Sequence, residues 1–195
     1  MSAVDLHPLA AELREALVQR VGEEKHSKSF PLYDWQRISY AFGRIPRGDS
    51  LLEVGPGKRY LTQMLAKSRR YQRQAAIDIV DHTGKMPKQV EFRQMSVAEL
   101  DFPDKSFDTV LCMEVLEHLD TPLLQPAIDH LRRVCRGRLI MSVPYLEPLP
   151  LPSYHLQRFD TARVLEMFPH ATMTVLFKEP VTRVPWLLLE ERFDR

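Results

Sequence analysis

The chain contains 195 residues, of which 44% are apolar and 27% charged, a size and composition that fit one globular domain with a single core. Its formal net charge of +1 provides no broad basic surface, so no nucleic-acid partner is expected. The two cysteines, Cys112 and Cys135, fit neither a disulfide framework nor a zinc spacing and are expected to be reduced core thiols. No signal-like or membrane-length apolar run is visible, and we expect a cytoplasmic protein without a membrane span.

Hydrophobic periodicity predicts helices and strands that alternate along the chain. The predicted helices cover residues 8–21, 33–42, 58–68, 121–136 and 161–168, and the polar residues 22–28 predict a loop. The predicted strands cover residues 50–54, 75–78, 90–95, 109–113, 138–143, 172–177 and 185–190. Residues 79–89 are near the minimum length for a parallel crossover and contain Gly84 and Pro87, so a loop or a single turn is expected there.

This alternation predicts an α/β fold with a doubly wound, mostly parallel sheet of seven strands and right-handed crossovers. The last two strands are predicted to form an antiparallel hairpin at the C-terminal edge of the sheet. We expect a single domain over residues 1–195, with an N-terminal helical cap over 1–45 and a ligand-binding core over 50–195.

The most informative pattern is an apolar strand that ends in an acid and two glycines, Glu53, Gly55 and Gly57. Glycine lets the backbone turn through positive φ and approach a ligand closely, and the helix that follows offers unpaired N–H groups. Asp78 ends the next apolar strand, which places its carboxylate at the same sheet edge, where it can accept hydrogen bonds from a ribose. These features predict a nucleoside-binding βαβ unit.

The ligand predicted here is not a dinucleotide such as NAD, because the third glycine of the dinucleotide-binding pattern G-x-G-x-x-G is missing. In addition, the negative charge of Glu53 beside the turn disfavours a pyrophosphate and favours an ammonium or a sulfonium group. S-adenosylmethionine carries both of these cations and a ribose.

At this point the chain resembles the class I S-adenosylmethionine-dependent methyltransferases of the small-molecule type. Glu53, Gly55 and Gly57 match the first motif of that family. In this chain, Arg59 stands where that motif has its third glycine. The block from Phe102 to Leu119, with "FPDKSFD" followed by "EVLEHL", is similar to the family's fourth-strand region. The similarity covers roughly residues 50–145 and implies a Rossmann-like fold, S-adenosyl-L-methionine as the cofactor and further cofactor-binding residues, which are Arg59, Ser96, Val97 and Met113.

Arg59 has two interpretations at this stage. It is either a surface residue on the first turn of the helix, or a guanidinium that bonds the carboxylate of the cofactor. Ser96 stands where the family usually has an Asp that bonds the adenine, so the backbone N–H of Val97 is expected to help in reading the ring.

Methyl transfer is an in-line displacement that depends mainly on positioning and on a dry pocket, with a base where the acceptor must lose a proton. His118, after the fourth strand, and His155, in "HLQRF", are the candidate catalytic bases, and His155 is alternatively a structural anchor of its loop. No metal is expected, because the segment from Glu114 to His118 has no second His nearby and no catechol-type metal site is visible.

The acceptor is predicted to be a small molecule, a sugar or a lipid precursor, enclosed by the N-terminal helices and the Pro144–Pro152 loop. The sequence lacks the Asn/Asp-Pro-Pro-Tyr-like element after strand four that accompanies adenine and glutamine methylation. Two alternatives stay open, a cofactor-binding but inactive regulatory relative and a protein or RNA methyltransferase that acts with a partner. The aromatic residues of segment 30–42 are either core packing or part of a lid over the acceptor. The oligomeric state is left open.

Overall fold

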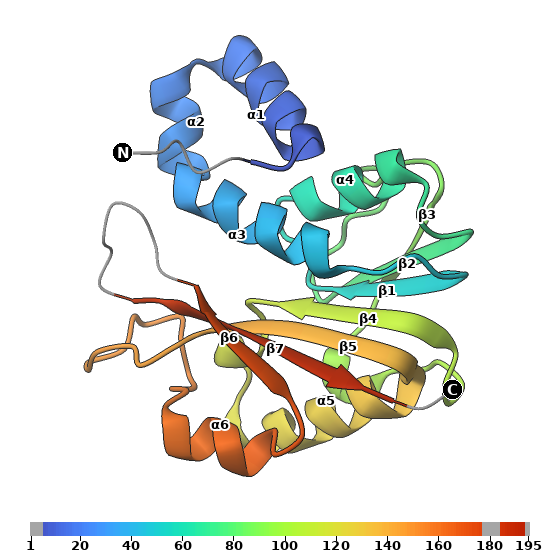
Figure 1. Ribbon diagram of the computed structural model, residues 1–195, viewed down its shortest axis with the longest axis vertical. Coiled ribbons are helices and arrows are strands. Elements are labelled where there is room, and N and C mark those ends of the chain that lie inside the picture. The colour runs from blue at the N-terminus through green and yellow to red at the C-terminus, as the bar shows by residue number, and fades with distance from the viewer. Residues whose placement is uncertain (1–5, 177–183, 194–195) are drawn as a thin grey trace.

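A computed structural model describes residues 6–176 and 184–193 (Figure 1). The helices are α1 (Pro8–Val21), α2 (Glu23–Ser29), α3 (Leu32–Arg44), α4 (Tyr60–Ser68), α5 (Thr121–Val134) and α6 (Thr161–Met167), with 3-10 turns η1 (Val97–Glu99) and η2 (Leu116–His118). The strands are β1 (Ser50–Val54), β2 (Arg73–Asp78), β3 (Val90–Gln94), β4 (Phe107–Met113), β5 (Cys135–Pro144), β6 (Thr172–Leu176) and β7 (Trp186–Arg192).

The seven strands form one sheet in the order β3-β2-β1-β4-β5-β7-β6. Strands β1 to β5 pair in parallel, and β7 lies antiparallel to both β5 and β6. The predicted doubly wound sheet with an antiparallel C-terminal edge is therefore confirmed. The chain order reverses between β1 and β4, and such a switch point forms a ligand crevice at the carboxyl ends of the strands.

Helices cover both faces of the sheet (Figure 1), and successive residues of the central strands alternate between two apolar cores. In β1, Leu51 packs with α3 and α4, whereas Leu52 packs with α5 on the other face. Burial on both faces explains why the central strands are continuous apolar runs and not alternating ones. The predicted loop over 79–89 is also observed, since only turns and bends connect β2 and β3.

The expected polar loop over residues 22–28 is wrong, because Glu23–Ser29 forms the short helix α2. Its two glutamates stand in the first turn, and Lys28 stands in the last, which complements the helix dipole. The buried imidazole of His26 then anchors α2 by accepting a 2.9 Å hydrogen bond from Trp35 Nε1. Only Gly22, at φ 83°, interrupts the helical course between α1 and α2.

Several helix boundaries differ from the prediction by one or two residues, and two of these differences have a clear cause. Helix α4 begins at Tyr60 and not near Lys58, because Arg59 adopts a left-handed conformation just before it. Helix α5 ends at Val134, and Cys135 is the first residue of β5 instead of a helical residue. Both cysteines are buried free thiols, as expected, and burial raises the pKa of each. Among residues 6–176 and 184–193, no helix is both long and apolar enough to cross a membrane.

Candidate active site

The turn after β1 has the backbone that its glycines predict. Gly55 and Gly57 both have positive φ, at 66° and 48°. A Cβ on Gly55 would lie 2.4 Å from Cγ2 of Val115, so a side chain there would collide with the segment that follows β4. Gly55 therefore lets the ends of β1 and β4 approach each other, which brings the two halves of the site together.

A cavity of about 180 Å³ lies at this turn, and its walls come from three parts of the chain. Its lining includes five of the residues predicted to bind the cofactor, which are Glu53, Gly55, Gly57, Arg59 and Met113. Phe30, Arg37 and Ile38 close it from the N-terminal helices, and Glu114 lies on the β4 side. A larger groove of about 790 Å³ runs between α1 and α4 and shares only Lys58, Arg59 and Tyr60 with this cavity.

Glu53 is the buried acid of this cavity, with 3% of its surface exposed. Burial raises the pKa of Glu53 to about 7. Its Oε2 atom has no hydrogen-bond partner among the described residues. Because an unpartnered buried carboxylate oxygen is costly, this atom is suited to a cationic donor from a ligand.

Asp78 ends β2 and is joined to Arg59 through a histidine that the sequence argument missed. His82 Nε2 lies 3.1 Å from Asp78 Oδ2, and His82 Nδ1 lies 3.0 Å from Nη1 of Arg59. The guanidinium can only donate, so the His82 proton is assigned to Nε2, which donates to Asp78. Arg59 also donates to the carbonyl of Gly57 at 3.1 Å. Its side chain thus lies against the glycine turn.

Ser96 and Val97 follow β3, which is the neighbour of β2 in the sheet. The Ser96 hydroxyl accepts a 3.2 Å hydrogen bond from the N–H of Ala98 and caps the turn η1. Neither residue lines the 180 Å³ cavity, so the structure separates this pair from the turn after β1.

Glu114 connects the cavity to the segment after β4. It has φ 56°, a strained conformation for a residue with a side chain, and such strain gathers at functional sites. Two hydrogen bonds hold it to the end of β5: its N–H donates to Ser142 O at 2.9 Å, and the Ser142 hydroxyl donates to Glu114 Oε1 at 2.8 Å. The turn η2 begins two residues later and carries Glu117 and His118.

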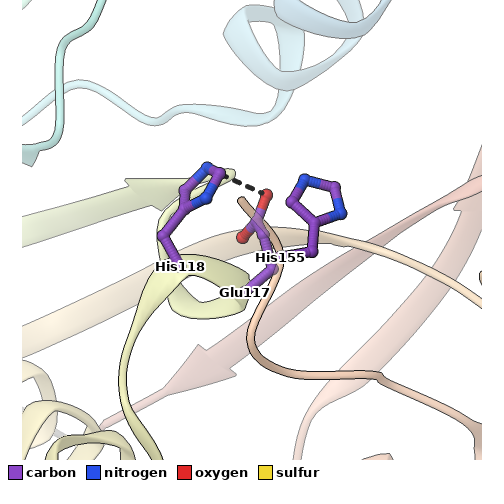
Figure 2. A group of neighbouring side chains, drawn as sticks. All are labelled: Glu117, His118 and His155. Carbon is purple, nitrogen blue, oxygen red and sulfur yellow. Dashed lines mark ion pairs between the residues drawn. The ribbon is translucent and has the colours of Figure 1, made fainter. Parts of the chain in front are cut away.

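Both candidate bases lie together, on either side of the Glu117 carboxylate (Figure 2). Their rings are 5.2 Å apart between centroids, and His118 Nε2 lies 3.9 Å from Glu117 Oε1. The fold brings them together because the carbonyl of Glu117 accepts hydrogen bonds from the N–H groups of Leu156 and Gln157. His155 thus supplies the second imidazole that the sequence argument against a metal site assumed to be missing.

Other groups fix the orientation of both rings. His118 Nδ1 donates to the carbonyl of Tyr154 at 2.7 Å, and His155 Nδ1 lies 2.6 Å from Oε2 of the buried Glu147. Glu117 itself is 1% exposed, and its Oε2 has no partner among the described residues. Burial, with Glu114 and Glu147 nearby, raises the pKa of Glu117 well above its ordinary value.

Comparisons with known proteins identify the family and the fold of this chain. A sequence profile described as "Methyltransferase domain" matches residues 27–179. A phosphatidylethanolamine N-methyltransferase from Cereibacter sphaeroides is 28% identical over 160 residues, which are 65% of this chain and 73% of the relative.

Two solved structures are similar to this chain over nearly its whole length. One is a 1,6-didemethyltoxoflavin-N1-methyltransferase from Burkholderia thailandensis with bound 1,6-didemethyltoxoflavin and S-adenosylhomocysteine. Its TM-score is 0.66 at 19% identity, covering 100% of this chain and 93% of that chain. The other is a methyltransferase solved with a Haloferax volcanii methyltransferase activator, with a TM-score of 0.67 at 15% identity over 96% of each chain. At these low sequence identities, the two structures show that the fold is shared and nothing further.

Proposed function

This chain belongs to the family of S-adenosylmethionine-dependent methyltransferases, and from that membership we propose that it methylates a small-molecule, sugar or lipid-precursor acceptor. The observation that carries the proposal is the group of carboxylates and imidazoles that begins at Glu114, on the wall of the cavity, and in which Glu117 is buried, His155 partly buried and His118 exposed. A compact polar group of this kind suits a small acceptor better than it suits a nucleic acid, which requires an exposed basic surface.

The residues of the cavity, together with Asp78, Ser96 and Val97 outside its lining at the ends of β2 and β3, fit S-adenosylmethionine. Glu53 offers an unpartnered carboxylate oxygen for the cofactor's ammonium, and the Gly55–Gly57 turn leaves room for close approach. Asp78 offers its carboxylate to the ribose hydroxyls, with His82 to orient it. Arg59 is proposed to donate to the cofactor's carboxylate, and Ser96 and Val97 are proposed to contact the adenine. Met113 and Phe30 exclude water from the cavity wall.

The proposed reaction moves a methyl group from the sulfonium of the cofactor to a lone pair of the acceptor. The carbon–sulfur bond breaks with its electron pair returning to sulfur, which becomes a neutral thioether. Where the acceptor carries a proton, His118 or His155 is the base that removes it. The main contribution of the chain is to hold acceptor and cofactor in line.

The relatives' names agree with a small acceptor without defining it. The Cereibacter sphaeroides relative is named for a phospholipid amine, and the Burkholderia thailandensis structure is named for a heterocyclic nitrogen. Because one of the similar structures was solved with an activator protein, a partner-dependent activity is the second candidate function.

Labelled cofactor tests the proposal. Purified protein is incubated with S-adenosylmethionine carrying a tritiated methyl group and with an extract separated into small-molecule, lipid, protein and RNA fractions. We expect label in the small-molecule or lipid fraction. Label only in protein or RNA would support the second candidate, and no label in any fraction would support an inactive relative.

A further inference from the structure

We propose that Glu117, His118 and His155 bind a divalent transition-metal ion beside the cofactor cavity. One ligand atom from each residue lies within 4.8 Å of the other two, and Figure 2 shows the carboxylate between the two rings. Three atoms that bind one tetrahedral ion at about 2.0–2.2 Å lie about 3.3–3.6 Å from one another. The separations between the three ligand atoms therefore have to shorten by up to about 1.5 Å, which side-chain rotations can supply.

The hydrogen bonds around both rings prepare them as ligands. The Tyr154 carbonyl can only accept, so Nδ1 of His118 carries the proton and Nε2 keeps its lone pair. The Glu147 carboxylate accepts from Nδ1 of His155 in the same way and leaves Nε2 of that ring as the available nitrogen. A second carboxylate or carbonyl behind each ligating imidazole is the usual arrangement around protein-bound metals.

The third ligand gives an independent indication of a cation. Oε1 of Glu117 faces His118 Nε2 at 3.9 Å, and the other carboxylate oxygen, Oε2, is buried and has no hydrogen-bond partner in the part of the chain that the structure describes. Glu114 and Glu147 add two further carboxylates nearby, and Arg37 is the guanidinium that acts on the same carboxyl. A divalent ion bound by both oxygens of Glu117 would pair Oε2 and offset this local concentration of negative groups.

The ligand set points to a class of ion. Two imidazoles with one carboxylate favour Zn²⁺, Mn²⁺, Fe²⁺ or Co²⁺ over Mg²⁺ and Ca²⁺, which prefer oxygen ligands throughout. Three protein ligands leave positions open for an acceptor oxygen, such as a hydroxyl or a phosphate. This role in acceptor binding rests on the proposed methyl transfer, whereas the binding of the ion does not.

The test is calorimetric titration of the chelator-treated full chain with Zn²⁺ and with Mn²⁺, in the absence of cofactor and acceptor. We expect one ion per chain. His118→Ala, His155→Ala and Glu117→Gln should each weaken binding by more than about 100-fold, and Glu147→Gln, which only orients His155, by about 10–100-fold. His170→Ala, an exposed histidine elsewhere, is the matched control and should bind as wild type does.

Glu117→Gln keeps the shape of the side chain, so this variant separates loss of a ligand from loss of the fold, and its circular dichroism should equal that of wild type. Co²⁺ bound to the wild-type protein should show visible absorption bands that disappear in His118→Ala. Absence of binding by wild type, or binding that persists in both histidine variants, would overturn the proposal. A failure of methyl transfer with intact ion binding would instead count against the proposed function alone.

Discussion

His82 lies between Asp78, at the end of β2, and Arg59, after the glycine turn: its Nε2 is 3.1 Å from Asp78 Oδ2 and its Nδ1 is 3.0 Å from Arg59 Nη1. Both of these neighbours are proposed to bind the cofactor. His82→Ala removes the donor that orients the Asp78 carboxylate. We expect S-adenosylhomocysteine to bind more weakly by about 1 kcal/mol, the usual value of one hydrogen bond. Calorimetry measures this, with His170→Ala as the control, and equal affinities for His82→Ala and wild type would contradict it.

Arg59 is predicted to lower the stability of the fold and to raise the affinity for the cofactor. Its φ of 62° is costly for a residue with a side chain, so Arg59→Gly is predicted to stabilise the fold by about 1 kcal/mol. The same change removes the guanidinium proposed to hold the cofactor's carboxylate, so affinity should fall by about tenfold.

Arg69 is the matched control for this prediction, because it has φ 51° at the other end of α4 and does not line the cavity. Arg69→Gly should gain stability without any loss of cofactor affinity. Urea unfolding and calorimetry measure the two effects separately. If Arg59→Gly binds the cofactor as well as wild type does, Arg59 is a surface residue after all.

Glu53 makes stability depend on pH. Burial raises its pKa from 4.5 to about 7, so the folded state keeps a proton that the unfolded state has lost. The stability contributed by this protonated form is present below about pH 4.5 and decreases as the pH rises towards 7. Glu53→Gln should therefore equal wild type near pH 4.5 and exceed it by about 3 kcal/mol above pH 7. Urea unfolding at a series of pH values measures the free energy of unfolding of both proteins. A difference between the two free energies that stays the same at every pH would contradict this prediction.

The same carboxyl predicts a pH dependence of binding. The cofactor's ammonium favours the ionised form of Glu53, so wild-type affinity for S-adenosylhomocysteine should increase as the pH passes through 7. In buffers of different ionisation enthalpy, binding near pH 6 should release a proton. Glu53→Gln should show neither effect, and a proton release that survives in this variant would assign it to another group.

Arg37 tests whether the N-terminal helices form part of the acceptor pocket. It lines the 180 Å³ cavity proposed for the cofactor and acts electrostatically on Glu117. Arg37→Gln should slow methyl transfer about tenfold or more, equal to about 1.4 kcal/mol, with little change in cofactor affinity. Arg14→Gln, on α1 and outside the cavity, is the control.

A point variant is preferable to removing residues 1–45, because Trp35 and Phe42 are fully buried and their loss would disturb the fold. An unchanged rate would leave these helices as a cover of the sheet face.

The sequence predicted those features that local patterns encode. The mostly parallel sheet and the turn at Gly55 follow from alternating helix and strand patterns and from the glycine pair, whereas the order of the strands in the sheet was not predicted. Helix α2 was missed because it has little apolar periodicity, and the contacts that hold it include the ion pair of Glu23 with Arg14 and the bond from Trp35 to His26. Such contacts depend on packing that no local window contains.

The acceptor side was the hardest part to predict. His118 and His155 were both identified as candidates, but their proximity arises from the return of the Pro-rich loop onto η2, through hydrogen bonds to the Glu117 carbonyl. His82 lies in a segment predicted only as a loop, and nothing in its neighbours indicates that it bonds Asp78. Long-range hydrogen bonds of this kind leave no periodic signal in a sequence.

Titration of S-adenosylhomocysteine into wild type, Asp78→Ala and Asp81→Ala is the most direct test of the cofactor site. Asp81 is an exposed carboxylate three residues further along, whose contact is with the N–H of Thr83, so it controls for the loss of charge. Asp78→Ala should lose about 1.5–3 kcal/mol of binding free energy, whereas Asp81→Ala should bind as wild type does. Equal affinities for Asp78→Ala and wild type, or no binding by wild type, would contradict the assignment of this edge of the sheet to the cofactor.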